Sequence, residues 1–135
     1  MKYVRTVVDI FIFPIVVFLL HAFLMVFFNI YAYCPDFDIP MHMLGGASVA
    51  VAYLQLYAIL NKKRYVPKLR PFVLSICVMS LVVTTAVFWE WWEFLMDYFF
   101  PQFMMQLNLQ DTMGDLLNGL IGGLAVILVC LRKKK

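Results

Sequence analysis

The stretch WEWWEFLMD, residues 89–97, places three carboxylates at the end of a long apolar run. The spacing of i, i+3 and i+7 puts Glu90, Glu93 and Asp97 on one face of a helix. Carboxylates in or near a bilayer cost free energy unless a partner offsets them. The carboxyl end of a helix also disfavours negative charge. The stretch therefore indicates that these acids serve a function.

The composition of the chain is typical of a membrane protein. Hydrophobic residues make up 64% of the 135 residues and charged residues only 14%, whereas soluble domains are nearer half apolar and a quarter charged. We predict an all-α, polytopic membrane protein that forms a single domain over residues 1–135. The three cysteines are an odd number spread along the chain, so we expect no disulfide framework.

Four apolar segments are long enough to cross a bilayer core, which takes about 20 helical residues. We predict a four-transmembrane-helix bundle with spans over residues 7–31, 41–60, 72–95 and 113–131. No small-x-small cleavage site follows the first segment, so we do not expect a cleavable signal peptide. The third helix should continue beyond the hydrocarbon and stop before Pro101.

The basic residues predict the orientation of the spans. All eleven Lys and Arg lie near the amino terminus, in the loop after the second span or in the carboxyl-terminal tail. With four spans these places share one side, which the positive-inside rule makes cytoplasmic. We expect both termini in the cytoplasm, the loop at 32–40 outside the cell membrane, and the connection at 102–110 on its outer surface. The basic clusters are short and juxtamembrane, so we expect lipid contacts and no nucleic-acid binding.

Three polar residues are predicted to lie at a similar depth. Glu90 lies 20 positions after the nearest basic residue, and His42 lies 20 positions before one. At 1.5 Å per residue, each is about 30 Å from the inner boundary. Asp115 lies 17 positions before the basic tail, or about 26 Å from that boundary. All three should therefore reach a level just below the outer interface.

Each of these residues belongs to a group on one helical face. The groups are Asp38 with His42, Glu90 with Glu93 and Asp97, and Asp111 with Asp115 and Asn118. If the faces point inward, all but Asp97 are predicted ligands of a divalent cation in an outward-opening pocket. The oxygen majority suits Mg²⁺, Mn²⁺ or Ca²⁺, and His42 with two or three carboxylates suits Zn²⁺ or Fe²⁺. A cation would also remove the repulsion among the acids.

Simpler interpretations stand beside this one. Acids near helix starts, such as Asp36 and Asp111, can serve only as caps, and His42 can be a satisfied interfacial histidine. His21 has no carboxylate at a matching spacing along its helix, so we interpret it as a polar contact between helices. The glycines at 45–46 and 119–123 predict close helix packing.

Three motifs in chain order carry a resemblance. They are Asp38-Ile-Pro-Met-His42, Glu90-Trp-Trp-Glu93 and Asp111-Thr112-Met-Gly-Asp115-Leu-Leu-Asn118-Gly119. This order resembles the VanZ-like and YjdF-like small membrane proteins over residues 36–125, although the YjdF-like pattern has more than four spans. The resemblance implies an envelope protein with a shared polar site, and VanZ itself is associated with glycopeptide-antibiotic resistance. It implies no particular reaction.

Two functions of different classes remain open. The first is a metal-dependent enzyme that acts on a lipid or lipid-linked phosphate at the outer leaflet, with Glu90 or Glu93 as general base and His42 beside them. The outer side has no basic residue to bind a phosphate, so the metal would supply all positive charge. The second is a non-enzymatic cation-binding or structural envelope protein. Four short spans cannot enclose a wide pore, so a channel would require an oligomer.

Overall fold

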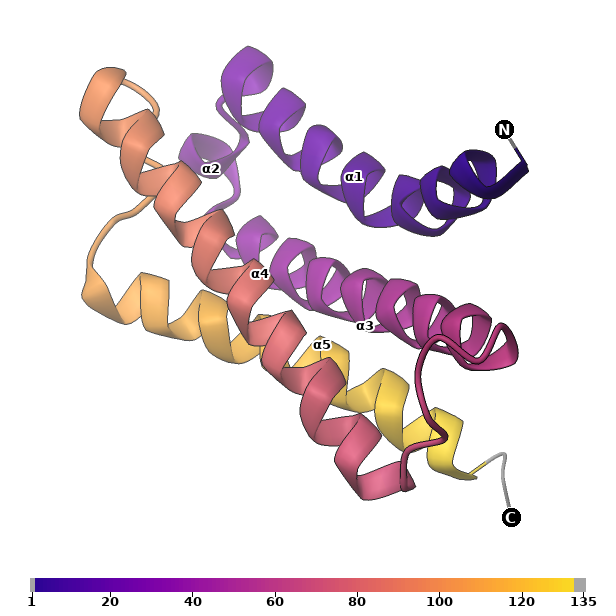
Figure 1. The fold of residues 1–135 in the computed structure, drawn as a ribbon. Coiled ribbons are helices and arrows are strands. Elements are labelled where there is room, and N and C mark those ends of the chain that lie inside the picture. The colour runs from indigo at the N-terminus through magenta and orange to yellow at the C-terminus, as the bar shows by residue number, and fades with distance from the viewer. Residues whose placement is uncertain (1, 133–135) are drawn as a thin grey trace.

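A computed structural model describes the backbone of residues 2–132 and the side chains of residues 8–30, 32–34, 36–130 and 132. Its elements, in chain order, are α1 (Lys2–Phe28), α2 (Ile30–Tyr33), η1 (Pro35–Phe37), α3 (Asp38–Lys62), α4 (Pro71–Phe99) and α5 (Leu109–Arg132) (Figure 1). Within the described part of the chain, four helices are long and apolar enough to cross a membrane. The predicted all-α fold with four long apolar helices is therefore confirmed.

The connection between the first two spans differs from the expected loop. The helix α1 ends at Phe28 rather than near residue 31, because Asn29 adopts a left-handed conformation with φ of 44°, which an α-helix does not continue. Helix α2 and η1 follow, and α3 already begins at Asp38. Pro40 thus lies in the first turn of α3, where its missing N–H breaks no helical hydrogen bond.

The last helix also begins earlier than predicted. Asn108 Oδ1 accepts hydrogen bonds from the backbone N–H groups of Gln110 (2.8 Å) and Asp111 (3.1 Å). This contact satisfies N–H groups that have no partner inside the helix, so α5 starts at Leu109 rather than near residue 113. Helix α4 ends at Phe99, two residues before Pro101, as expected for a helix that a proline terminates.

Helix α3 contacts α1, α4 and α5, and its contact with α5 is the most extensive. Glycines allow the two backbones to meet. A Cβ atom on Gly46 would overlap the carbonyl oxygen of Gly119, and one on Gly122 would overlap that of Met43. The predicted close-packing role of the glycines is confirmed. These backbone contacts set the distance between α3 and α5.

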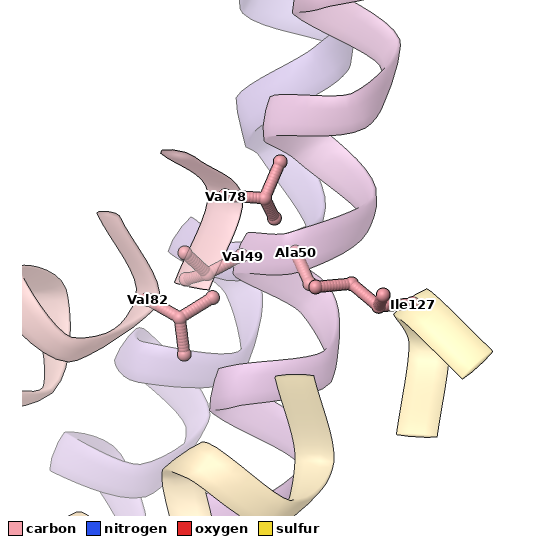
Figure 2. Packing of buried hydrophobic residues seen from close by; sticks show 5 residues of the cluster. All are labelled: Val49, Ala50, Val78, Val82 and Ile127. Atoms are coloured by element: carbon pink, nitrogen blue, oxygen red, sulfur yellow. The ribbon is translucent and has the colours of Figure 1, made fainter. Parts of the chain in front are cut away.

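The apolar side chains divide between a small core and a large exterior. Val49, Ala50, Val78, Val82 and Ile127 form a buried cluster among α3, α4 and α5 (Figure 2). Many other large apolar side chains are exposed, from Phe13 in α1 to Leu128 in α5. Contiguous exposed apolar surface of this kind suits hydrocarbon and not water.

Charge is segregated between the two ends of the bundle. The start of α1 and the end of α5 lie at one end (Figure 1), where the basic segments between α3 and α4 also lie. The carboxylates at residues 90–97 and 111–115 belong to the other end, which we call the acidic end. Residues 133–135, which contributed to the predicted orientation, lie outside the described part. That the acidic end faces outward stays a prediction.

Candidate metal centre

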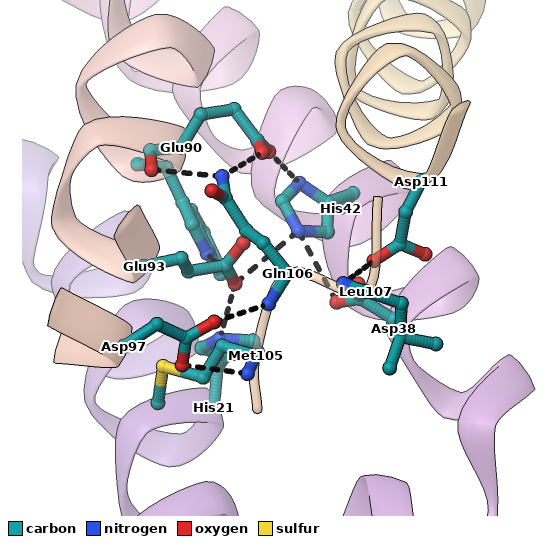
Figure 3. Close-up of polar contacts among 11 residues, drawn as sticks. His21, Asp38, His42, Glu90, Glu93, Asp97, Met105, Gln106, Leu107 and Asp111 are labelled. Carbon is teal, nitrogen blue, oxygen red and sulfur yellow. Dashed lines mark hydrogen bonds and ion pairs between the residues drawn. The ribbon is translucent and has the colours of Figure 1, made fainter. Parts of the chain in front are cut away.

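Six polar side chains from all four long helices meet inside the acidic end. They are His21 of α1, Asp38 and His42 of α3, Glu90 and Glu93 of α4, and Asp115 of α5, and we call them the polar cluster. Each is less than a tenth exposed. Figure 3 shows five of them facing one another.

Glu93 lies at the centre of the polar cluster and is fully buried. Its Oε1 atom is 2.9 Å from His21 Nε2 and 3.7 Å from His42 Nε2. The same oxygen accepts a hydrogen bond from Trp89 Nε1 at 3.1 Å. Its Oε2 atom is buried and has no hydrogen-bond partner among the described residues. One carboxylate thus joins α1, α3 and α4.

His42 connects the two carboxylates on either side of it. Its Nε2 atom is 3.2 Å from Asp38 Oδ1, one turn earlier in α3, and its Nδ1 atom is 3.7 Å from Glu90 Oε1. The predicted i, i+4 face of Asp38 and His42 therefore points into the bundle. Asp38 begins α3, yet its carboxylate lies beside His42 inside the cluster and is 6% exposed.

The connection between α4 and α5 folds back over the polar cluster. Asp97 accepts hydrogen bonds from the backbone N–H groups of Met105 and Gln106, both at 2.8 Å. Gln106 Nε2 in turn donates to Glu90 Oε2 and to the Glu90 carbonyl, both at 3.0 Å. Met105 is 1% exposed. Met105 and Gln106 therefore cover the cluster, and the expectation that this connection lies on the membrane surface stays a prediction.

Trp89 forms an apolar wall on one side of the cluster. Its ring centroid lies 4.8 Å from that of His21 and 4.9 Å from that of His42. Phe18 packs edge-on against it from α1. Such rings exclude water, and exclusion of water strengthens the electrostatic interactions behind them.

The donor atoms are spaced as ligands of one ion would be. Three overlapping triads, His21-Asp38-Glu93, Asp38-His42-Asp115 and His42-Glu90-Glu93, each bring their donor atoms within 4.8 Å of one another. Bonds of 2.0–2.1 Å in a tetrahedral arrangement place neighbouring ligand atoms about 3.3 Å apart. The observed separations of 2.9–3.7 Å between imidazole nitrogens and carboxylate oxygens lie around this value.

Two sizeable openings reach the cluster through the described part of the chain. A cavity of about 320 Å³ at the acidic end, which we call the mouth, is lined by Asp36, Asp38, Asp111 and Asp115 together with residues of the connections. A recess of about 350 Å³ between α4 and α5, which we call the lateral recess, reaches Glu90 and Gln106 past apolar side chains. A larger apolar groove of about 470 Å³ along α1 lies on the other side of Trp89.

The structure brings together five of the seven residues predicted as metal ligands, namely Asp38, His42, Glu90, Glu93 and Asp115. The other two were Asp111 and Asn118. Asp111 Oδ2 accepts a hydrogen bond from the Leu107 backbone N–H at 3.0 Å and lines the mouth. Asn118 is half-buried, and its role as a ligand stays a prediction.

His21 and Gln106 are the residues that the sequence interpretation missed at this site. His21 does make the predicted contact between helices, but its partner is the central Glu93. The sequence does indicate the depth of His21, because this residue lies 16 positions after Arg5, or about 24 Å along the helix. That depth is close to the depth of Asp115. For Gln106 no signal existed, because its position depends on how the connection folds.

Comparisons with known proteins give a family and no activity. The family described as predicted membrane protein, DUF2238, matches residues 4–135. An uncharacterized protein of Thermotoga maritima is 33% identical over 116 residues, which are 85% of this chain. The chain spans 58% of the length of that relative. No solved structure matches the chain.

Proposed function

The chain belongs to the DUF2238 family of predicted membrane proteins, and we propose that it binds divalent metal in the polar cluster to act on a lipid-linked phosphate. The observation that supports a metal is an imbalance of charge. Four carboxylates of the cluster are buried, and the sequence has no Lys or Arg between residues 6 and 61 or between 71 and 131. Buried charges without a counter-ion cost several kcal/mol each. Even with both imidazoles of the cluster protonated, two of the four negative charges would remain, and a divalent cation would balance them.

The donor set narrows the choice of metal. His21 adds a second imidazole to the carboxylates, so the cluster is richer in nitrogen than the sequence interpretation assumed. Imidazole suits Zn²⁺ and Fe²⁺, carboxylate suits Mn²⁺, and Mg²⁺ and Ca²⁺ take oxygen ligands. We therefore propose Zn²⁺, Mn²⁺ or Fe²⁺ over the two hard cations.

The two openings support an amphiphilic substrate. The positive-inside rule places the acidic end on the outer side of the cell membrane, which is the orientation we propose. The lateral recess opens beside Trp91 and Phe94, which are 60% and 57% exposed. A phosphate head group could reach the metal while its apolar chain remains beside α4 and α5. An envelope role of this kind agrees with the resemblance to VanZ-like and YjdF-like proteins.

Glu90 is better placed than Glu93 to act as general base. Glu90 lines the lateral recess, and its Oε1 atom has no hydrogen-bond partner among the described residues. Glu93 is enclosed at the centre of the cluster. In hydrolysis, Glu90 would accept a proton from the attacking water, the new bond would form between that oxygen and phosphorus, and the bond from phosphorus to the lipid oxygen would break. The proton would then return to the leaving lipid alcohol. Bound metal would supply the positive charge that the phosphate oxygens require.

One observation favours a second function, cation binding without turnover. The mouth is lined by four aspartates, which attract a cation and repel a free phosphate anion. A protein that only binds a cation at the envelope, as part of a structural polar core, would need this mouth and no lateral access.

Metal analysis of the detergent-purified protein tests the proposal. We expect stoichiometric divalent metal in the wild type and in Asp9→Asn, an exposed acid outside the cluster, and loss of metal in Glu93→Gln. Glu90→Gln should retain metal but lose phosphate release from polyisoprenyl phosphate and diacylglycerol phosphate. A wild-type protein without metal would refute the metal centre. Wild-type metal without release from either substrate would favour cation binding.

A further inference from the structure

The polar cluster contains more donors than one metal ion uses. It offers two imidazoles and four carboxylates, whereas Zn²⁺ in proteins usually has four ligands, and a catalytic site keeps one position for water. A single ion bound by one imidazole and two carboxylates would leave two carboxylates buried with a net charge of about −2, which is costly at this depth.

The imidazoles of His21 and His42 also belong to different donor triads. Among the described residues, none of the three donor triads contains both His21 and His42. Their ring centroids are 6.1 Å apart. The triads of the two histidines share a carboxylate, because Asp38 belongs both to the triad with His21 and to one with His42. A carboxylate has two oxygens and can therefore bind one ion with each.

Buried atoms without hydrogen-bond partners point to occupants beyond the protein itself. In the described part of the chain, His42 Nε2 and Glu93 Oε2 are buried and accept or donate no hydrogen bond. His42 and Glu93 share one triad, and each also belongs to a second triad that does not contain the other. Each of these atoms is a donor that a metal ion could take as a ligand.

We infer that the polar cluster holds two divalent ions, a deepening that rests on the proposed metal centre. One ion is bound by His21 and Glu93, the other by His42 and Asp115. Asp38 bridges the two. Glu90 remains unbound on the Nδ1 side of His42, 3.7 Å away, which is the side from which carboxylates orient metal-bound histidines.

Two ions account for features that one ion leaves unexplained. Their charge of +4 balances the four carboxylates, so the cluster becomes neutral. Two-metal sites hold ions about 3.5–4 Å apart and stabilise both the attacking and the leaving oxygen of a phosphate ester. The second ion would thus take the role that Arg or Lys plays at other phosphate sites, in an end of the protein whose sequence contains neither residue.

Metal stoichiometry of the full chain in detergent tests this inference. The protein is stripped with a chelator, loaded with Mn²⁺, desalted and analysed for Mn per chain, with Zn²⁺ loading as an independent count. We expect a ratio of two and an electron paramagnetic resonance spectrum broadened by coupling between the ions. His21→Asn should halve the ratio and give the six-line spectrum of isolated Mn²⁺, whereas Asp9→Asn should keep both wild-type values.

The outcomes separate this inference from the proposed function. A wild-type ratio of one with the spectrum of an isolated ion overturns the two-ion centre and leaves the metal centre standing. A ratio of two without coupling also overturns it, because the ions would then lie apart. A ratio of zero with both metals overturns both proposals. The metal ratio and the spectrum of the wild type distinguish one ion from two even if His21→Asn fails to fold. Gel filtration shows whether that variant is folded.

Discussion

Replacement of Gly122 by Ala tests the contact that positions the two halves of the polar cluster. Gly122 lies in α5, where its missing side chain admits the backbone of α3. An added Cβ would overlap the carbonyl oxygen of Met43 and lie 2.8 Å from the carbonyl carbon and 3.1 Å from Ala47 N. These are backbone atoms, which cannot rotate away as a side chain would. The two helices must therefore separate.

The magnitude follows from two opposing effects. Alanine favours an α-helix over glycine by about 1 kcal/mol, and this gain applies at any interior helical position. Overpacking at Gly122 costs about 1–3 kcal/mol. Gly114 is a matched control in the same helix, because a Cβ there meets nothing within 4 Å. Gly122→Ala should therefore be less stable than Gly114→Ala by about 1–3 kcal/mol.

Equilibrium unfolding in mixed detergent micelles measures this difference in free energy. Separation of the helices should also weaken Mn²⁺ binding, because α3 carries Asp38 and His42 while α5 carries Asp115. If Gly122→Ala unfolds with the same free energy as Gly114→Ala, the close backbone contact between α3 and α5 is refuted, and with it our account of how Asp115 reaches the cluster.

Two further substitutions test the groups around the cluster. Asp97→Asn removes the charge and one of the two acceptors that bind the N–H groups of Met105 and Gln106. The free energy of opening of this connection, measured by amide hydrogen exchange, should fall by about 1–3 kcal/mol. Unchanged protection of these two amides would contradict this role. Trp89→Phe keeps an aromatic ring but removes the N–H donor to Glu93, so affinity for Mn²⁺ should fall by about 10–100-fold. Equal Mn²⁺ titrations of both proteins would show that this hydrogen bond does not orient the carboxylate.

Much of the candidate site could be predicted because depth in a membrane helix follows from counting residues. Glu90, His42 and Asp115 were placed at one level by the constant rise of the α-helix, and the structure brings all three together. The same rise, counted from Arg5, gives His21 a similar depth.

The ends of elements were less predictable than their existence. Asn108 caps α5 by accepting hydrogen bonds from the N–H groups of Gln110 and Asp111. Asp111 has an equally suitable capping side chain, so the sequence offers two possible starts for this helix. Asn29 ends α1 in a left-handed backbone conformation, which asparagine adopts more readily than most residues but does not adopt wherever it occurs. Local signals of this kind admit several boundaries, and tertiary contacts select one.

The amino-acid sequence by itself determined that this protein has four long apolar helices and that all its acids except Asp9 lie at the end opposite its bases. These properties depend only on the local length and polarity of each segment, because hydrocarbon excludes charge wherever the helix lies. Only the tertiary structure decided which helical faces meet, so that His21 contacts Glu93 and Gln106 covers Glu90. The rotation of each helix depends on backbone contact with its neighbour, as at Gly122 and Met43, and no single segment of the chain contains that information.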